Sequence, residues 1–218
     1  VEHQFQFRTI TEELKTPWSI AFLPDDRILV TELPGRLRVI ERGKLLPDAV
    51  AGTPVVRAKG QGGLMTVAAH PDFAQNGWIY LAYSDPATLD NKDVGMTAIV
   101  RGRIKDNRWT DEQMIFRAKP EHYVQTTVHY GCRLTFDDKG YLYFSIGERG
   151  IKEHAQELSR PNGKIHRLHD DGRIPQDNPF VGQSNAVASI WSYGNRNPQG
   201  LVFNRVTGEL WETEHGPR

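Results

Sequence analysis

The sequence predicts an all-β fold, a partial β-propeller with about three and a half blades. A strand–turn–strand pattern occurs four times along the chain. The 218 residues include 20 Gly and 13 Pro, so turns interrupt the chain too often for long helices. The one helical candidate is a short turn near residues 153–158. A β-sandwich with accidental self-similarity is the alternative.

The repeat begins at residues 20–31, where two apolar, β-branched runs flank an Asp-rich turn. Aligning one position of each copy gives intervals of 47, 67 and 67 residues, from Phe22 to Ala69, Phe136 and Phe203. Asp, Asn and Gly between the runs tolerate turn dihedrals. Each copy is therefore expected to form a β-hairpin.

Further strand candidates lie between the copies, at residues 36–40 and 98–104. Two hairpins per period make a four-stranded sheet, and such sheets repeated radially make a propeller. The fourth copy reaches Arg218 without an outer hairpin, whereas propellers typically close with about four to eight blades. We interpret residues 1–218 as a single partial propeller domain, a fragment whose remaining blades are absent from this chain. A chain completed by a second copy is the alternative.

Charge and composition exclude several classes. Lys plus Arg and Asp plus Glu both total 27, giving zero formal charge and a pI of about 7.2. This balance argues against a broad nucleic-acid binder. No apolar run approaches the roughly 18 residues of a membrane-spanning helix. The single cysteine, Cys132, excludes an intrachain disulfide and a multi-cysteine zinc site.

Unusual polar residues gather in the loops that precede the repeat copies. Gln61 lies between glycines before the second copy, His129 precedes the third, and Arg196 and Asn197 precede the fourth. In a radial array such loops converge on one central volume, so we expect these side chains to face a common pocket.

Glu148 ends the hairpin that His129 opens, so antiparallel pairing can bring the two together. A carboxylate beside an imidazole fixes its tautomer and favours proton uptake, as a general base requires. The alternatives are that His129 caps a strand turn and that Glu148 forms a weak surface ion pair with Arg149. Nucleotide-binding glycine loops, an EF-hand and an H-E-x-x-H motif do not occur.

These loops resemble those of the soluble PQQ-dependent aldose sugar dehydrogenases, the glucose/sorbosone dehydrogenase family. The order and rough spacing of the matching stretches hold across nearly the whole chain, and together they are highly specific. They are residues 16–22, 60–63, 129–134, 162–165, 174–180, 193–200 and 215–217.

The resemblance implies a six-bladed propeller with PQQ and Ca²⁺ in its central cleft, in a periplasmic or secreted protein. Members oxidise the anomeric hydroxyl of an aldose to a lactone. On this sequence the family's general base corresponds to His129 and its carboxylate partner to Glu148. The residues corresponding to the family's PQQ contacts are Gln61, Arg196 and Asn197, with Arg196 stabilising negative charge on the quinone oxygen.

The family's calcium is bound partly by backbone carbonyls of a Gly-Pro pair, corresponding to Gly216 and Pro217. Carbonyl oxygens suit a hard cation, so a missing acidic cluster is no objection. This chain departs from the family in having Cys132 where a glycine is usual, and the thiol is expected to add bulk beside the base. The family's cationic PQQ-carboxylate ligands lie in later blades, beyond Arg218.

The resemblance also implies partners: an aldose substrate and an external electron acceptor. A homodimer stays open, and no nucleic acid or membrane span is expected. Two other functions are alternatives: a non-catalytic propeller module that binds a partner or glycan, and a calcium-dependent lactonase-like propeller. The lactonase class is disfavoured because such sites need a cluster of acidic ligands, which this sequence lacks.

Overall fold

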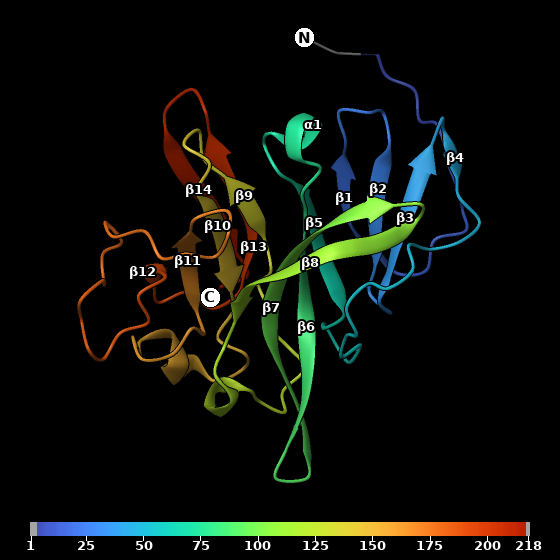
Figure 1. The fold of residues 1–218 in the computed structure, drawn as a ribbon. Helices are drawn as coiled ribbons and strands as arrows, with labels where there is room; N and C mark the ends of the chain where they lie inside the picture. Colours follow the sequence, from blue (N-terminus) through green and yellow to red (C-terminus); the bar gives the residue numbers. More distant parts are fainter. Residues whose placement is uncertain (1–3, 217–218) are drawn as a thin grey trace.

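The computed structural model describes residues 4–216, which form four antiparallel sheets with very little helix (Figure 1). The all-β prediction is confirmed. The strands of the first sheet lie in chain order: β1 (Pro17–Phe22), β2 (Ile28–Glu32), β3 (Arg36–Glu41) and β4 (Lys44–Leu45).

The second and third sheets are also four-stranded, as two hairpins per period predict. The second contains β5 (Leu64–Ala69), β6 (Ile79–Leu89), β7 (Lys92–Lys105) and β8 (Arg108–Arg117). Its β6–β7 hairpin projects beyond the rest of the molecule, opposite the end where α1 lies (Figure 1). The third contains β9 (Leu134–Phe136), β10 (Leu142–Ile146), β11 (Lys164–Leu168) and β12 (Ile190–Tyr193).

The fourth sheet has two strands in the described residues, β13 (Pro198–Asn204) and β14 (Glu209–Glu214). All four repeat copies are therefore hairpins. The first strands of successive sheets pack in order, β1 against β5, β5 against β9, and β9 against β13. This packing brings the loops before these strands to one end of a common axis, as the repeat predicts.

Three short helices interrupt the strands. A 3₁₀ turn at Lys152–Ala155 lies where the sequence predicts helix. The structure adds α1 (Phe73–Asn76) and a 3₁₀ turn at Pro120–His122. The sequence did not predict these two helices, because the residues around them are typical of turns. Gly77, in the left-handed conformation with φ 67°, ends α1.

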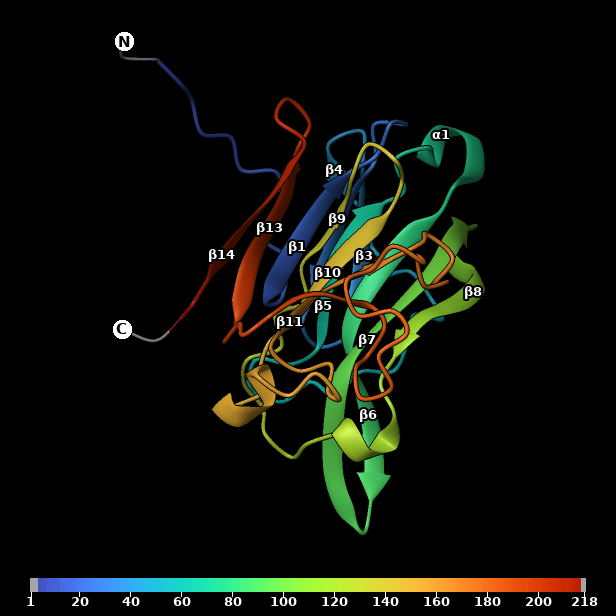
Figure 2. The same ribbon diagram turned by 90° about the vertical axis from the view of Figure 1, so that its left-hand side faces the viewer.

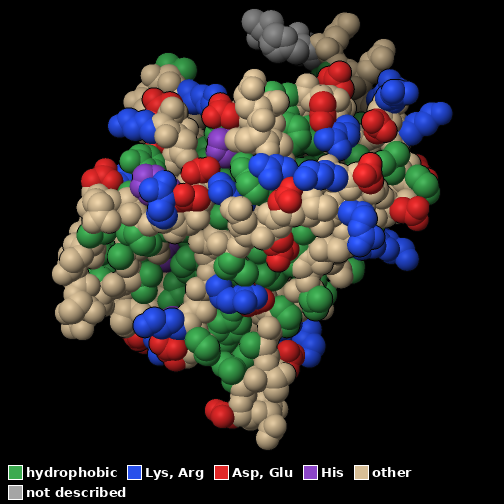
Figure 3. Space-filling model, viewed as in Figure 1, with side chains coloured by type: hydrophobic (Ala, Val, Ile, Leu, Met, Phe, Trp, Pro, Cys, Tyr) green, Lys and Arg blue, Asp and Glu red, His purple; other side chains and the backbone are tan. Residues whose placement is uncertain are grey.

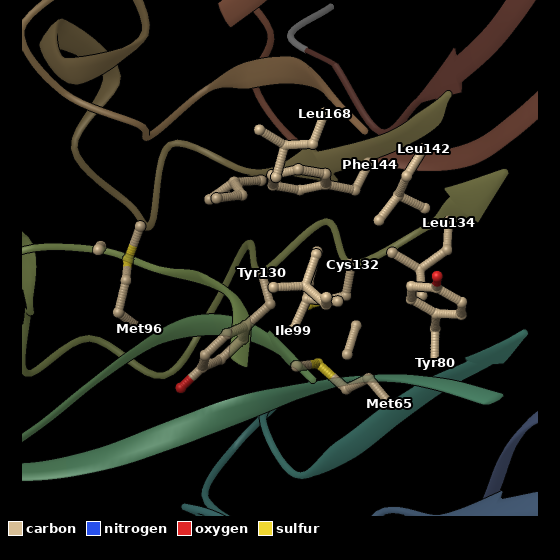
Figure 4. Packing of buried hydrophobic residues seen from close by; sticks show 14 of the residues in the cluster. Met65, Tyr80, Met96, Ile99, Tyr130, Cys132, Leu134, Leu142, Phe144 and Leu168 are labelled. Carbon is tan, nitrogen blue, oxygen red and sulfur yellow. The ribbon is translucent and has the colours of Figure 1, made fainter. Parts of the chain in front are cut away.

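Apolar side chains pack between neighbouring sheets in two clusters. One joins the first and second sheets through Leu29, Leu37 and Leu81. The other joins the second and third sheets, where Tyr80 and Phe144 are fully buried (Figure 4). The first three sheets are thus buried against one another, which fixes the relative positions of the loops at their ends.

The outer surface mixes cationic and anionic side chains, with no single-sign patch on the face in Figure 3. Turning the molecule shows β13 and β14 along one side, beside β1 (Figure 2). Several large apolar side chains there are more than half exposed: Ile20, Phe22, Val202 and Trp211. No helix among the described residues is long and apolar enough to cross a membrane.

Candidate active site

A cavity of about 280 Å³ lies where the loops before β5, β9 and β13 meet. Its wall includes Gln61, His129 and Asn197, three of the residues that the sequence analysis predicts around one pocket. Segments widely separated in sequence supply its wall: Trp18, Gln61, Met65, His129, Tyr130, Gly131, Asn197, Gln199 and His215.

His129 and Glu148 form the titratable pair of this site. Glu148 follows β10, is 3% exposed, and its carboxylate Oε1 accepts a hydrogen bond from His129 Nδ1–H. The Glu148 N–H donates to the Arg196 carbonyl at 2.8 Å, which ties the carboxylate to the loop before β13. Because Nδ1 carries the proton shared with Glu148, Nε2 is the ring nitrogen able to accept another. The predicted proximity of the two residues is confirmed.

Gln61 holds the backbone of His129. Its Oε1 accepts the His129 N–H at 2.8 Å, and its own N–H donates to the Thr127 carbonyl at 2.8 Å. The turn needs glycine at position 63, because a Cβ there would lie 2.0 Å from the Leu33 carbonyl oxygen. The glycine-rich segment thus brings Gln61 against the His129 loop.

Asn197 is 5% exposed and bridges two parts of the wall. Its Oδ1 accepts the Gly131 N–H at 3.2 Å and the Gln199 side-chain amide at 2.9 Å. Among the described residues, its Nδ2 donors have no partner. They are available to a ligand in the cavity.

Arg196 lies beside the cavity and not in its wall. One guanidinium nitrogen donates to the His215 carbonyl at 2.8 Å, and the Arg196 N–H donates to Glu214. Gly216 directly follows His215 but does not line the cavity, and Pro217 lies outside the described residues. No group of three or more His, Cys, Asp or Glu side chains in residues 4–216 could hold a metal ion.

Cys132 does not crowd the base, so the expectation of added bulk beside His129 is wrong. The neighbouring Gly131 lines the cavity, whereas the Cys132 side chain turns into the core beside Ile99 (Figure 4). Its Sγ lies 3.4 Å from the Thr97 hydroxyl, and burial raises the pKa of the thiol to about 12. The thiol is therefore a packed, unreactive group.

The sequence did not single out several wall residues. Trp18, Gln199 and His215 lie within stretches that carry the family resemblance. Their place in these stretches could have identified them as site residues. Tyr130 lies in the 129–134 stretch that carries the same resemblance, whereas Met65 had no local signal, because an apolar residue at a strand start usually belongs to the core.

Four antiparallel sheets that pack in series, with a cavity at the loops before their first strands, define the class of all-β fold to which the chain belongs. The sequence model of the Glucose / Sorbosone dehydrogenase family matches residues 14–218. The chain belongs to this family.

Curated relatives agree with this assignment. The chain is 45% identical over 212 residues to "Aldose sugar dehydrogenase YliI" of Escherichia coli (strain K12), covering 96% of this chain and 56% of the relative. It is 31% identical to "Quinoprotein glucose dehydrogenase B" of Acinetobacter calcoaceticus, covering 98% and 48%. The chain thus spans about half the length of the relatives it matches.

Solved structures share the fold. The soluble aldose sugar dehydrogenase from Escherichia coli, in its apo-form, superposes with a TM-score of 0.89 at 44% identity, covering 97% of this chain and 60% of that one. The PQQ-bound aldose sugar dehydrogenase from Streptomyces coelicolor gives 0.81 at 27% identity, covering 96% and 59%.

Proposed function

We propose that the complete protein is a PQQ-dependent aldose dehydrogenase with a six-bladed propeller. It oxidises the anomeric hydroxyl of an aldose to a lactone. The observation that carries this proposal is the buried Glu148 carboxylate against His129 on the wall of the axial cavity. An imidazole oriented by a carboxylate is the arrangement that general-base catalysis requires.

The reaction removes a proton from the sugar hydroxyl and a hydride from C1. His129 Nε2 accepts the proton, and Glu148 stabilises the resulting imidazolium through Nδ1–H. Gln61 holds the His129 backbone and leaves its own amide donors for the substrate or cofactor. When bound, PQQ supplies the quinone that accepts the hydride, and an external acceptor takes up the electrons.

The residues at the cavity fit a planar anionic cofactor. Asn197 has free amide donors, and the Arg196 guanidinium has five N–H donors, of which the His215 carbonyl accepts one. Both residues would bind the cofactor's oxygens, and Trp18 offers a flat apolar surface in the wall. The cavity volume lies just below the roughly 300–1,000 Å³ of small-molecule sites.

Calcium belongs to the same proposal. Because the described residues lack an acidic cluster, backbone carbonyls such as that of Gly216 would hold the ion. A periplasmic or secreted location and an external electron acceptor follow from family membership and are proposed with it. The similarity to sugar dehydrogenases does not favour a non-catalytic partner or glycan module.

Calorimetric titration of the complete protein with PQQ and Ca²⁺, followed by dye reduction with glucose, tests the proposal. We expect binding and sugar-dependent reduction. No heat of binding and no turnover would refute it, and glycan binding without PQQ would favour the non-catalytic module.

Replacing His129 with Gln removes the base but keeps a polar side chain of similar reach. General-base catalysis contributes about 10²–10⁴-fold, so we expect kcat to fall within that range while the Kd for PQQ changes less than about threefold. Steady-state kinetics and calorimetry measure the two effects. His169→Gln, outside the cavity wall, is the control; equal activity of His129→Gln and wild type would exclude His129 as the base.

A further inference from the structure

Arg149, the residue after Glu148, is fully buried at 0% exposure and contacts the loop that carries His129. It forms no ion pair with Glu148 or with any other carboxylate in the described residues, so the alternative of a surface Glu148–Arg149 pair is wrong. The guanidinium carbon lies 3.5 Å from the centroid of the Tyr130 ring. Burial of a cation without a counter-ion costs free energy and lowers the pKa of this guanidinium. The hydrogen bonds of the guanidinium must therefore offset that cost.

The guanidinium donates to backbone carbonyls of the His129 loop and of β7. Its Nε donates to the Val128 carbonyl at 2.9 Å, and Nη2 donates to the Thr126 carbonyl at 2.8 Å. Nη1 donates to the Gly95 carbonyl of β7 at 3.0 Å. In return, the Thr126 hydroxyl donates to the Arg149 carbonyl at 2.6 Å.

These contacts flank His129 in a segment with no regular structure of its own. Residues 124–133 contain only an isolated bridge from Val124 to Gly95. His129 has φ 52°, in the left-handed region that non-glycine residues rarely adopt. Such a conformation persists when the surroundings over-determine it. Arg149 binds the carbonyl before His129 and stacks on the ring of Tyr130 after it.

We propose that Arg149 is a positioning residue for His129, its planar fork holding the 126–130 backbone against β7 so that the imidazole meets Glu148. The catalytic meaning of this role rests on the proposed function. Lysine cannot replace it, because an ammonium lacks the planar fork that binds several carbonyls in fixed directions. Misplacing a catalytic group by about 1 Å can cost about 10²-fold in rate.

Arg149→Lys and Arg149→Met in the complete protein test the proposal. Arg167→Met is the matched control: Arg167 is also buried and stacked on an aromatic ring, but it bonds Asp177 and Asn178 outside the cavity wall. We expect both Arg149 variants to lower kcat per PQQ-loaded site at least tenfold, with KM for sugar within twofold. Arg167→Met is expected to lower the melting temperature but keep kcat within twofold.

Amide hydrogen exchange provides a readout that needs no turnover. The His129 N–H is bound by Gln61 Oε1, so its exchange in Arg149→Lys should accelerate at least tenfold, and in Arg167→Met it should not. If wild type oxidises no sugar, the proposed function fails and exchange alone decides the role of Arg149. Unchanged kcat or unchanged His129 exchange in a folded Arg149 variant would overturn the proposal.

If both Arg149 variants fail to fold, Thr126→Val tests the positioning role of Arg149 instead. It removes only the hydroxyl that donates to the Arg149 carbonyl. Faster exchange at His129 is then expected, together with a kcat several-fold below wild type. Wild-type values of both would overturn the proposal.

Discussion

At the scale of single residues, Glu148 decides which nitrogen of His129 carries the proton. The carboxylate is a pure acceptor, so it selects the Nδ1–H tautomer, and its second oxygen is buried without a partner in the described residues. The tautomer that Glu148 selects leaves Nε2 unprotonated, so Nε2 is the ring atom that can take a proton from a substrate.

Glu148→Gln tests this tautomer argument. The amide keeps the shape but can donate to Nδ1, which would place the proton on Nε2 and block proton uptake there. We expect kcat to fall by about 10²-fold or more, by analogy with tautomer-fixing carboxylates in general. Thermal melting and dye-reduction kinetics measure the outcome, and a variant with wild-type kcat would contradict the assigned role.

His166 links folding to pH. Its ring stacks on Phe144 at a centroid distance of 4.8 Å, and its nitrogens contact the Ser189 hydroxyl and the Pro161 carbonyl. Burial lowers the pKa of His166 from 6.5 to about 3. The unfolded chain therefore binds a proton that the folded chain excludes, and the free energy of unfolding must fall as pH drops below 6.5.

His166→Gln removes this linkage while keeping polar atoms for both contacts. At about 1.4 kcal/mol per pH unit, His166 accounts for about 2 kcal/mol of the stability lost between pH 6.5 and 5. Urea denaturation at pH 7 and pH 5 should show a correspondingly smaller loss in the variant. His70, His122 and His154, whose pKa values burial also lowers, titrate in both proteins. Equal losses would contradict the argument.

At the scale of elements, the end of β10 meets the His129 loop at Gly147. A Cβ on Gly147 would lie 2.3 Å from the His129 carbonyl oxygen and 3.0 Å from Asn197 Oδ1. Both neighbours belong to the site. The absence of a Cβ at Gly147 therefore allows the third sheet to approach the His129 loop this closely.

Gly147→Ala should therefore displace His129 from Glu148. We expect kcat to fall more than tenfold and stability to fall by about 1–3 kcal/mol, the range for overpacking. Gly140→Ala is the control: a Cβ there would have nothing within 4 Å, so the only cost of this alanine is the backbone strain of φ 81°. Kinetics and denaturation of the two variants measure the difference; similar activities would show that Gly147 does not limit the site.

At the scale of the whole molecule, an exposed apolar groove lies between β1 and the fourth sheet. Ile20, Val202 and Trp211 line it, at exposures of 53%, 58% and 58%. Contiguous apolar surface of this kind drives association in water. Residues 1–218 expressed alone should therefore self-associate with little dependence on salt.

The double substitution Val202→Lys with Trp211→Lys should reduce this association. Because both side chains are exposed, the free energy of unfolding should stay near that of the wild type. Val206→Lys is the matched control, because Val206 is 94% exposed at a hairpin tip outside the groove. Sedimentation equilibrium across protein concentrations measures the association constant. Association that persists in the double variant, or that disappears in the control, would place the contact elsewhere.

The order of the hairpins was predictable because it depends on local turn chemistry. The convergence of the loops before β5, β9 and β13 was predictable because it depends on the spacing of the repeat copies. The nearness of His129 and Glu148 follows from one hairpin, so the sequence alone anticipated it. The direction of Cys132 was not predictable, because whether its side chain faces the cavity or the core depends on the left-handed backbone at Gly131 and Cys132, with φ 64° and 72°.

The sequence by itself determined the strand repeat, the family and the polar residues of the axial loops. The number of blades in the complete protein stays a prediction. The packing of the sheets was needed to show that Arg196 lies outside the cavity wall, bonded to the His215 carbonyl, and that Met65 lies in the wall. Burial of Arg149 under the His129 loop was likewise decided by this packing. Turn and strand preferences act between near neighbours, whereas these placements depend on how separate sheets pack against one another.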